Sequence, residues 1–140
     1  MPYGLEPRYP VIGDSVVDKR GVRKLLLCSG RITWDLMVER KKREGDEPTT
    51  AIARVEQLYP RPLEELKAEL ASYPNLEEVR WVQDEPANMG PWPHYALNLR
   101  HELDVPFHRV SRPESSSPAV GQASRHAEEQ KAILAQAFDD

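Results

Sequence analysis

Two adjacent acids, Asp84 and Glu85, follow an apolar segment in the stretch WVQDEPANMGPW, residues 81–92. A pair of carboxylates at a strand end can act as general acid and general base when burial raises one of the two pKa values. The same groups can instead pair with arginines or accept hydrogen bonds from backbone amides at a turn. The sequence leaves both roles open, and we expect the structural role for this pair and for Glu56.

Other signatures of catalysis are missing from the sequence. It contains no glycine-rich dinucleotide or phosphate-loop motif and no GxSxG segment. His94 and His101 are seven residues apart, but no third residue is spaced to complete a zinc site with them. The single cysteine, Cys28, excludes an internal disulfide and a CxxC metal site, and it fits a reducing cytosol.

The composition is that of one globular domain. The 140 residues are 39% hydrophobic and 30% charged, which is enough for a packed core. With a formal net charge of −4, the chain lacks the excess of basic residues that binds nucleic acid or a membrane surface, so neither is an expected partner. No apolar run approaches the ~20 residues of a membrane span, and no signal peptide is evident. We expect a bacterial cytoplasmic protein in preference to one of the mitochondrial matrix.

The chain divides into a leading segment and an α/β unit. Residues 1–20 hold three prolines and two glycines without a periodic pattern, which predicts a surface linker. Residues 21–140 then alternate between short apolar runs and amphipathic segments. The predicted strands lie within 22–30, 49–58, 77–85 and 106–112, and the predicted helices within 31–45, 62–74, 91–103 and 123–138. This alternation predicts a three-layer α/β/α fold on a mainly parallel sheet.

Polar residues follow each predicted strand, at the edge where open parallel sheets bind ligands. Backbone N–H groups at the start of the first helix, with nearby arginines, could hold the phosphates of a nucleotide or a coenzyme A ester. The residues of this candidate anion site are Ser29, Gly30, Arg31, Arg54, Arg109 and Arg112. In the alternative reading, these arginines only neutralise nearby acids. Structural or interface roles are expected for Glu56, Gln57, Gln83, Asp84, Glu85, Asn88 and Trp92.

Four segments carry a family resemblance: LLLCSG, AIARVEQLYPRP, VRWVQDEPANMGPW and SRPESSSPAVGQASRHAEEQ. Together they resemble the C-terminal region of the thiamine-dependent, decarboxylating component of 2-oxoglutarate dehydrogenase, a transketolase-like family. The similarity runs from about Pro10 to Phe138. Asp84, Pro91, Arg61, Ser111 and Glu114 depart from the family pattern, which weakens any transfer of individual contacts.

The resemblance implies a function for a larger enzyme. That enzyme decarboxylates 2-oxoglutarate on thiamine diphosphate with magnesium and passes a succinyl group to the lipoamide of dihydrolipoyl succinyltransferase. Its cofactor lies on a GDG...N motif of an earlier domain, which is absent here, so we expect this chain to bind no cofactor and to be non-catalytic alone. Packing on the preceding thiamine-binding domains, homodimer formation and regulation by acetyl-CoA or AMP are further implications.

A second hypothesis is a free-standing nucleotide- or coenzyme A-binding module that keeps the fold without the enzyme. The two hypotheses differ in their expected surfaces. An enzyme domain should expose apolar surface and self-associate when its neighbours are absent, whereas a module should remain monomeric. Trp81 should be buried within the domain, and Trp92 should be covered by another domain or subunit.

Overall fold

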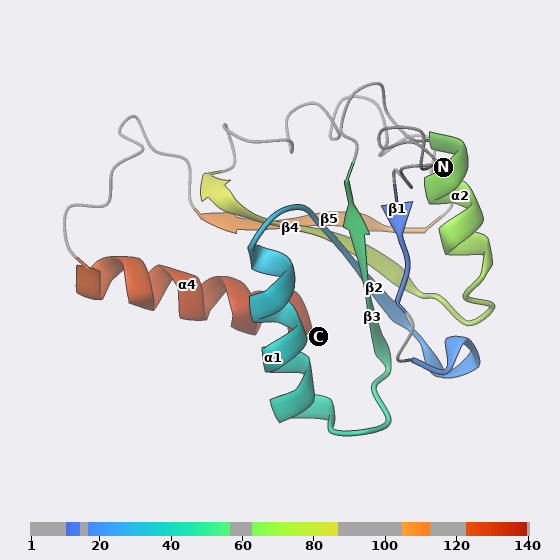
Figure 1. Cartoon of the computed structure of the whole chain (residues 1–140), viewed down its shortest axis with the longest axis horizontal. Coiled ribbons are helices and arrows are strands. Elements are labelled where there is room, and N and C mark those ends of the chain that lie inside the picture. Colours follow the sequence, from blue (N-terminus) through green and yellow to red (C-terminus); the bar gives the residue numbers. More distant parts are fainter. Residues whose placement is uncertain (1–10, 15–16, 57–62, 87–104, 113–122, 140) are drawn as a thin grey trace, which may run out of the picture.

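The computed structural model describes residues 11–14, 17–56, 63–86, 105–112 and 123–139. They form a five-stranded sheet in the order β1-β3-β2-β4-β5 (Figure 1). The strands are β1 (Val11–Ile12), β2 (Lys24–Cys28), β3 (Thr50–Val55), β4 (Glu78–Pro86) and β5 (Phe107–Arg112). The helices are α1 (Ile32–Glu44), α2 (Leu63–Ala71) and α4 (Ala123–Phe138), with a 3₁₀ turn at Lys19–Gly21.

The sheet is mixed. β3, β2, β4 and β5 pair in parallel, as the alternation of strands and helices predicted. β1 pairs antiparallel with β3, placing Val11 opposite Val55 and Ile12 opposite Arg54. The register between β4 and β5 shifts after Val82, because the carboxyl end of β4 is irregular. The expected mainly parallel sheet therefore carries one antiparallel edge strand.

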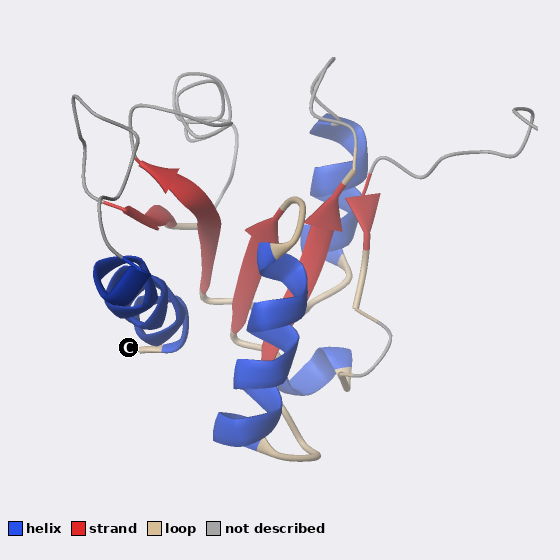
Figure 2. Ribbon diagram, turned by 60° about the vertical axis from the view of Figure 1, so that its left-hand side comes forward, coloured by secondary structure: helices blue, strands red, loops and turns tan. Residues whose placement is uncertain are grey.

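The helices cover both faces of the sheet, which confirms the three-layer arrangement (Figure 2). On the α2 side, Leu25 and Leu27 of β2 pack in a core with Leu66 of α2 and Trp81 of β4. On the other side, Leu26 packs in a second core with residues of α1 and α4. Successive residues of a strand point to opposite faces, so the apolar run of β2 supplies both cores.

Helix α1 forms where buried apolar residues recur at helical spacing, and it ends at a glycine. Ile32 and Leu36, one turn apart, are buried against the sheet. The helix ends at Gly45, whose φ of 66° is strained for other residues and whose N–H donates to the carbonyl of Lys41 at 3.2 Å. Arg40, which the sequence groups with the basic end of the helix, is buried.

The predicted linker, residues 1–20, contributes to this sheet. Val11–Ile12 is the edge strand β1, and Asp14 is buried in an ion pair with Arg40. Asp14 also accepts a hydrogen bond from the Ile52 N–H at 2.9 Å, and Arg40 donates to the carbonyl of Thr50 at 3.2 Å. A two-residue strand has no detectable periodicity, which is why the sequence pattern reads as a linker. A domain boundary at residue 21 stays a prediction, but residues 11–14 pack as part of the fold.

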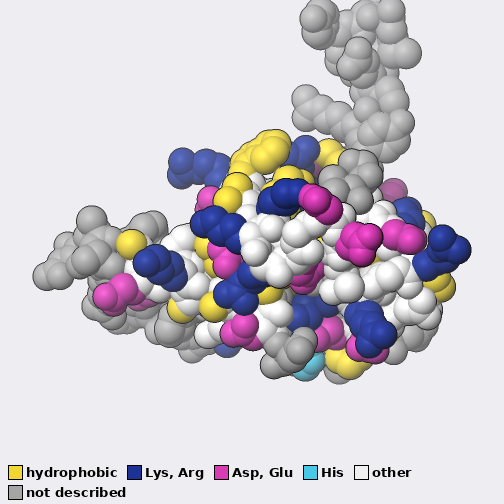
Figure 3. Space-filling view, turned by 90° about the horizontal axis from the view of Figure 1, so that it is seen from below, with side chains coloured by type: hydrophobic (Ala, Val, Ile, Leu, Met, Phe, Trp, Pro, Cys, Tyr) yellow, Lys and Arg dark blue, Asp and Glu magenta, His cyan; other side chains and the backbone are white. Residues whose placement is uncertain are grey.

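Several predicted features lie outside the described residues. They include the helix expected within 91–103 and the serine- and proline-rich loop that follows β5. Within the described part of the chain, no helix combines the length and apolarity needed to cross a membrane. Acidic and basic side chains are interspersed over the face seen in Figure 3.

Candidate functional site

The first predicted site element, the turn after β2, lies at the start of α1 as expected. Gly30 has a φ of 77°, and its carbonyl accepts a hydrogen bond from the Thr33 N–H at 3.2 Å. Ser29 is half-buried, whereas Gly30 and Arg31 are exposed. Arg31 is the N-cap residue and makes no side-chain capping hydrogen bond. The turn therefore brings three of the predicted anion-site residues together at a helix N-terminus.

Cys28 closes β2 beneath this turn. Its Sγ lies 3.2 Å from Thr33 Oγ1 and donates to the carbonyl of Ala53 at 3.7 Å. Burial raises the pKa of this thiol from 9.0 to about 11, partly offset by the contact with Thr33 and by the charge of Arg54. The thiolate is the reactive form of cysteine, so the fold keeps Cys28 protonated and inert at neutral pH.

Arg54 is held by its own surroundings. It forms an ion pair with Glu56. Its guanidinium also lies 5.9 Å from the centroid of the Trp34 ring, within range of a cation–π interaction. The atom that makes this ion pair is Arg54 Nε, which is itself buried. These contacts favour the neutralising role of Arg54 over that of an open anion ligand.

The polar residues at the end of β4 are partly internal. Gln83 is buried; its Oε1 accepts a hydrogen bond from Trp81 Nε1 at 3.0 Å, and its Nε2 donates to the carbonyl of Glu85 at 3.2 Å. Trp81 is fully buried, as predicted. Asp84 is half-buried and Glu85 is exposed. Gln83 thus fixes the Trp81 ring and the end of the strand.

The structure does not bring Arg109 to Arg54. Arg109 pairs with Trp81, whose ring belongs to the α2-side core, so Arg109 lies on that face of the sheet. Arg54 is two residues beyond Ile52 of the opposite core and therefore lies on the α1 side. Their strands are also separated by β2 and β4, which corresponds to about 14 Å at ordinary strand spacing. One small anion cannot contact both guanidinium groups in this arrangement.

The remaining predicted site residues cannot be placed. Gln57, Asn88 and Trp92 lie outside the described residues. The backbone of Arg112 ends β5 opposite Pro86, and its side chain is outside the described part.

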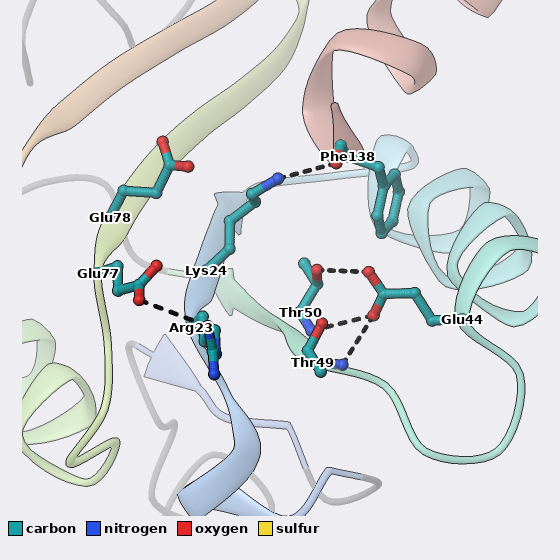
Figure 4. A pocket seen from close by; sticks show the side chains of 8 residues that line it. All are labelled: Arg23, Lys24, Glu44, Thr49, Thr50, Glu77, Glu78 and Phe138. Carbon is teal, nitrogen blue, oxygen red and sulfur yellow. Dashed lines mark hydrogen bonds and ion pairs between the residues drawn. The ribbon is translucent and has the colours of Figure 1, made fainter. Parts of the chain in front are cut away.

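A pocket that the sequence did not predict lies at the opposite, amino edge of the sheet (Figure 4). Its volume is about 720 Å³, and it is lined by Arg23, Lys24, Glu44, Thr49, Thr50, Glu77, Glu78 and Phe138. Glu44 accepts hydrogen bonds from the N–H groups of Thr49 and Thr50 at 2.9 and 3.0 Å and from Thr50 Oγ1 at 2.7 Å. The acid thereby fixes the turn between α1 and β3.

Two strand cations bind the C-terminal end of α4 near this pocket. Lys24 Nζ donates to the carbonyls of Phe138 and Asp139 at 2.8 and 3.2 Å. Arg80 Nη1 donates to the carbonyls of Gln136 and Ala137 at 2.5 and 3.3 Å. These carbonyls lack intrahelical partners at a helix end. The last turn of α4 contains no basic residue, so β2 and β4 supply the cations that a helix C-terminus favours. The sequence signal for these contacts was the presence of a basic residue inside each of two otherwise apolar strand segments.

The described residues do not fit a magnesium–diphosphate site. Among them, no group of three histidine, cysteine or acidic residues is arranged to hold a metal ion. Arg54 and Arg109 of the predicted anion site lie on opposite faces of the sheet.

Comparison with solved structures defines the class of domain. The chain resembles a chain described as "Split gene transketolase, inactive beta4 tetramer", with a TM-score of 0.59 and 16% identity, over 83% of this chain and 39% of that one. At this identity the likeness concerns the fold alone. The described part of the chain has a transketolase-like α/β fold.

Sequence comparison defines the family. The sequence model described as "2-oxoglutarate dehydrogenase C-terminal" matches residues 8–138. The chain therefore belongs to the 2-oxoglutarate dehydrogenase C-terminal family. It is 44% identical over 121 residues to the 2-oxoglutarate dehydrogenase E1 component of Cupriavidus necator, covering 84% of this chain and 12% of that protein.

Other relatives have different whole-protein names. The chain is 38% identical over 129 residues to the 2-oxoadipate dehydrogenase complex component E1 of Rattus norvegicus, covering 92% of this chain and 14% of that protein. It is 42% identical over 132 residues to the multifunctional 2-oxoglutarate metabolism enzyme of Mycobacterium sp. (strain KMS), covering 92% and 10%. The chain thus spans about an eighth of the length of the curated relatives it matches.

Proposed function

We propose that this chain acts as the C-terminal structural domain of a thiamine-dependent 2-oxo acid dehydrogenase E1 component. The match over residues 8–138 to the C-terminal family carries this proposal. The polar residues at the carboxyl ends of the strands support it, because they bind other residues of the domain: Arg54 binds Glu56, and Gln83 binds the Trp81 ring. In this role the domain stabilises the assembled enzyme and performs no proton transfer.

The proposal assigns the chemistry to other domains. Thiamine diphosphate and magnesium bind to the preceding thiamine-binding domains of a cytoplasmic, homodimeric E1, which delivers an acyl group to its dihydrolipoyl acyltransferase. Relatives named for 2-oxoglutarate and for 2-oxoadipate both match this chain, so the match does not choose between the two substrates. The names of these relatives favour the domain role over a free-standing nucleotide- or coenzyme A-binding module.

Reconstitution from two parts tests the proposal. The thiamine-binding part of the Cupriavidus necator relative, lacking its own matched C-terminal region, is mixed with this chain. Association is followed by light scattering, and turnover is followed with 2-oxoglutarate and with 2-oxoadipate. We expect the mixture to associate and to recover turnover that neither part shows alone. Absence of association under conditions where both parts are folded would contradict the proposal.

A further inference from the structure

Residues 11–14 alternate between the two faces of the sheet. Val11 packs against the α2-side core and Gly13 lies against α2, whereas Asp14 is bound to α1. Ile12 is opposite a residue of β3 whose side chain lies on the α1 side. This is the alternation of a strand, whose successive residues point to opposite faces. The segment, the N-terminal strap, therefore contacts both helical layers at the outer edge of β3 (Figure 2).

On the α1 side the strap is held by one carboxylate. Asp14 forms its ion pair with Arg40 of α1, and the two side chains have exposures of only 2% and 6%. The same carboxylate accepts the hydrogen bond from the Ile52 N–H of β3 at 2.9 Å. Arg40 in turn donates to the carbonyl of Thr50, also in β3. Asp14 thus joins the strap to α1 and to β3 at once.

On the α2 side the strap is held at a glycine. A Cβ atom at Gly13 would lie 2.7 Å from Glu69 Oε1 and 2.8 Å from Glu69 Oε2, so this carboxylate packs directly against the glycine. The carboxylate is fixed by the hydroxyl of Tyr73, which donates to Glu69 Oε2 at 2.6 Å. Tyr73 is itself buried in the α2-side core. Only a residue without a side chain leaves room for an acid fixed in this way.

The two anchors of the strap are adjacent in the chain. Consecutive Cα atoms are about 3.8 Å apart, so a displacement of Gly13 also moves Asp14. The anchors also influence each other electrostatically. Burial and the hydrogen bond to Glu69 raise the pKa of Tyr73, and the charge of Asp14 raises it further. A change at the α2 anchor therefore reaches the α1 anchor through one short extended segment.

We propose that the N-terminal strap couples the two helical layers of the domain, because it docks against α1 and α2 together and is released from both together. Its release leaves Arg40 as a buried charge without its carboxylate and opens the edge of β3. In the proposed function the thiamine-binding domains precede this segment, so a displacement of those domains that pulls on the strap loosens both layers. This consequence rests on the proposed function, whereas the coupling is a property of this chain alone.

Hydrogen exchange followed by NMR tests the coupling across the sheet. The Ile52 N–H points to the strap, whereas the Ala53 N–H points to β2, because successive N–H groups of a strand alternate in direction. Tyr73→Phe removes the hydroxyl that fixes Glu69 on the α2 side. We expect the Ile52 amide to exchange about tenfold faster in this variant, as for the loss of one hydrogen bond, and the Ala53 amide to change by less than about twofold.

Ser72→Ala is the matched control for this substitution. Ser72 Oγ donates to the main-chain carbonyl of Glu69, also at 2.6 Å, so the variant removes an equally short hydrogen bond at the end of α2 and leaves the carboxylate in place. We expect Ser72→Ala to change the exchange of Ile52 by less than about twofold. The proposal is overturned if Tyr73→Phe accelerates Ile52 no more than Ser72→Ala does, or if it accelerates Ala53 as much as Ile52.

A double-mutant cycle tests the α2 anchor directly. The methyl group of Gly13→Ala displaces the Glu69 carboxylate, so we expect this variant to accelerate exchange at Ile52 by about tenfold. In a Glu69→Ala chain the methyl group has room, and adding Gly13→Ala should change the rate by less than about twofold. Equal effects of Gly13→Ala in the two chains would overturn the proposal. Every measurement uses this chain alone, so a failed reconstitution with a thiamine-binding part leaves the coupling standing.

Discussion

Lys24 and Phe138 are 114 residues apart, and the ammonium of the first donates a 2.8 Å hydrogen bond to the carbonyl of the second. The contact joins the start of the central strand β2 to the end of the last helix. Lys24 also donates to Asp139, and Arg80 binds the two preceding carbonyls. The C-terminal end of α4 is thus held by cations from the two middle strands of the parallel sheet.

Removing the Lys24 ammonium should destabilise the domain. Hydrogen bonds that involve a charged group contribute about 1.5–3 kcal/mol each, so we expect Lys24→Met to lower the free energy of unfolding by about 2 kcal/mol. Urea unfolding followed by circular dichroism measures this change. Lys42→Met, at an exposed position of α1, is the control and should change stability by less than about 0.5 kcal/mol. Equal effects of the two substitutions would show that the contact between Lys24 and the end of α4 does not stabilise the domain.

The buried ion pair between Asp14 and Arg40 should be essential for the N-terminal strand. Removal of one partner leaves an uncompensated buried charge, so Asp14→Asn or Arg40→Met should each cost about 3–5 kcal/mol. Combining the two should cost clearly less than the sum, because the second change removes the orphaned charge. Additive losses in a double-mutant cycle would contradict this account. Hydrogen exchange at Ile52, whose N–H donates to Asp14, should report the same loss locally.

Cys28 should make the domain less stable at alkaline pH. Its folded pKa is about 11 and its ordinary pKa is 9.0. Below pH 9 both the folded and the unfolded chain hold the thiol proton, so the protonated thiol of Cys28 makes its full contribution to stability. As pH rises toward 11, only the unfolded chain releases the proton, and up to roughly 3 kcal/mol of stability is lost. Burial and the 2.6 Å hydrogen bond to Glu69 also raise the pKa of Tyr73 above 10.0, which adds a loss in the same direction.

The contribution of the thiol can be isolated by substitution. Unfolding free energies of the unsubstituted chain and of Cys28→Ala are compared between pH 8 and pH 11. We expect the variant to be less stable at pH 8 but to lose less with rising pH. The folded thiol should also resist modification at pH 8, whereas the urea-unfolded thiol should react. Parallel pH profiles for the two proteins would show that Cys28 does not titrate with unfolding.

The predicted anion site should not operate as one site. Arg54 and Arg109 lie on opposite faces of the sheet, and Arg54 is already paired with Glu56. If AMP or acetyl-CoA binds to this chain, Arg54→Met and Arg109→Met should not both weaken binding. Calorimetric titration of each ligand at low and moderate salt measures this. A tenfold loss of affinity in both single variants would restore the site expected from the sequence.

The sequence predicted the elements that repeat a clear pattern. The run Leu25–Leu27 is buried on both faces, and Ile32 and Leu36, one helical turn apart, define the inner face of α1. Glu56 pairs with Arg54 because residues two apart on one strand lie on the same face. Trp81 of β4 is buried in the α2-side core, as predicted.

The missed features all depend on long-range contacts. The two residues of β1 carry no periodicity, and the burial of Asp14 follows from Arg40, 26 residues later. Lys24 and Arg80 resemble ordinary surface cations until the end of α4 is placed beside them. Arg54 and Arg109, expected at one edge, lie apart in the structure. To predict this, one must know which face of the sheet each strand position points to and the order of the strands.

A chimera tests the central claim most directly. This chain replaces the 121-residue matched region of the Cupriavidus necator E1 component, and turnover is measured per assembled enzyme beside a variant that lacks the region. A purely structural domain predicts that the deletion fails to assemble. It also predicts that the chimera assembles with turnover within about threefold of the parent, a change of roughly 0.7 kcal/mol in the activation free energy. A chimera that assembles and binds thiamine diphosphate normally, but loses turnover more than about 100-fold, would contradict the account, because such a loss is typical of a missing catalytic group.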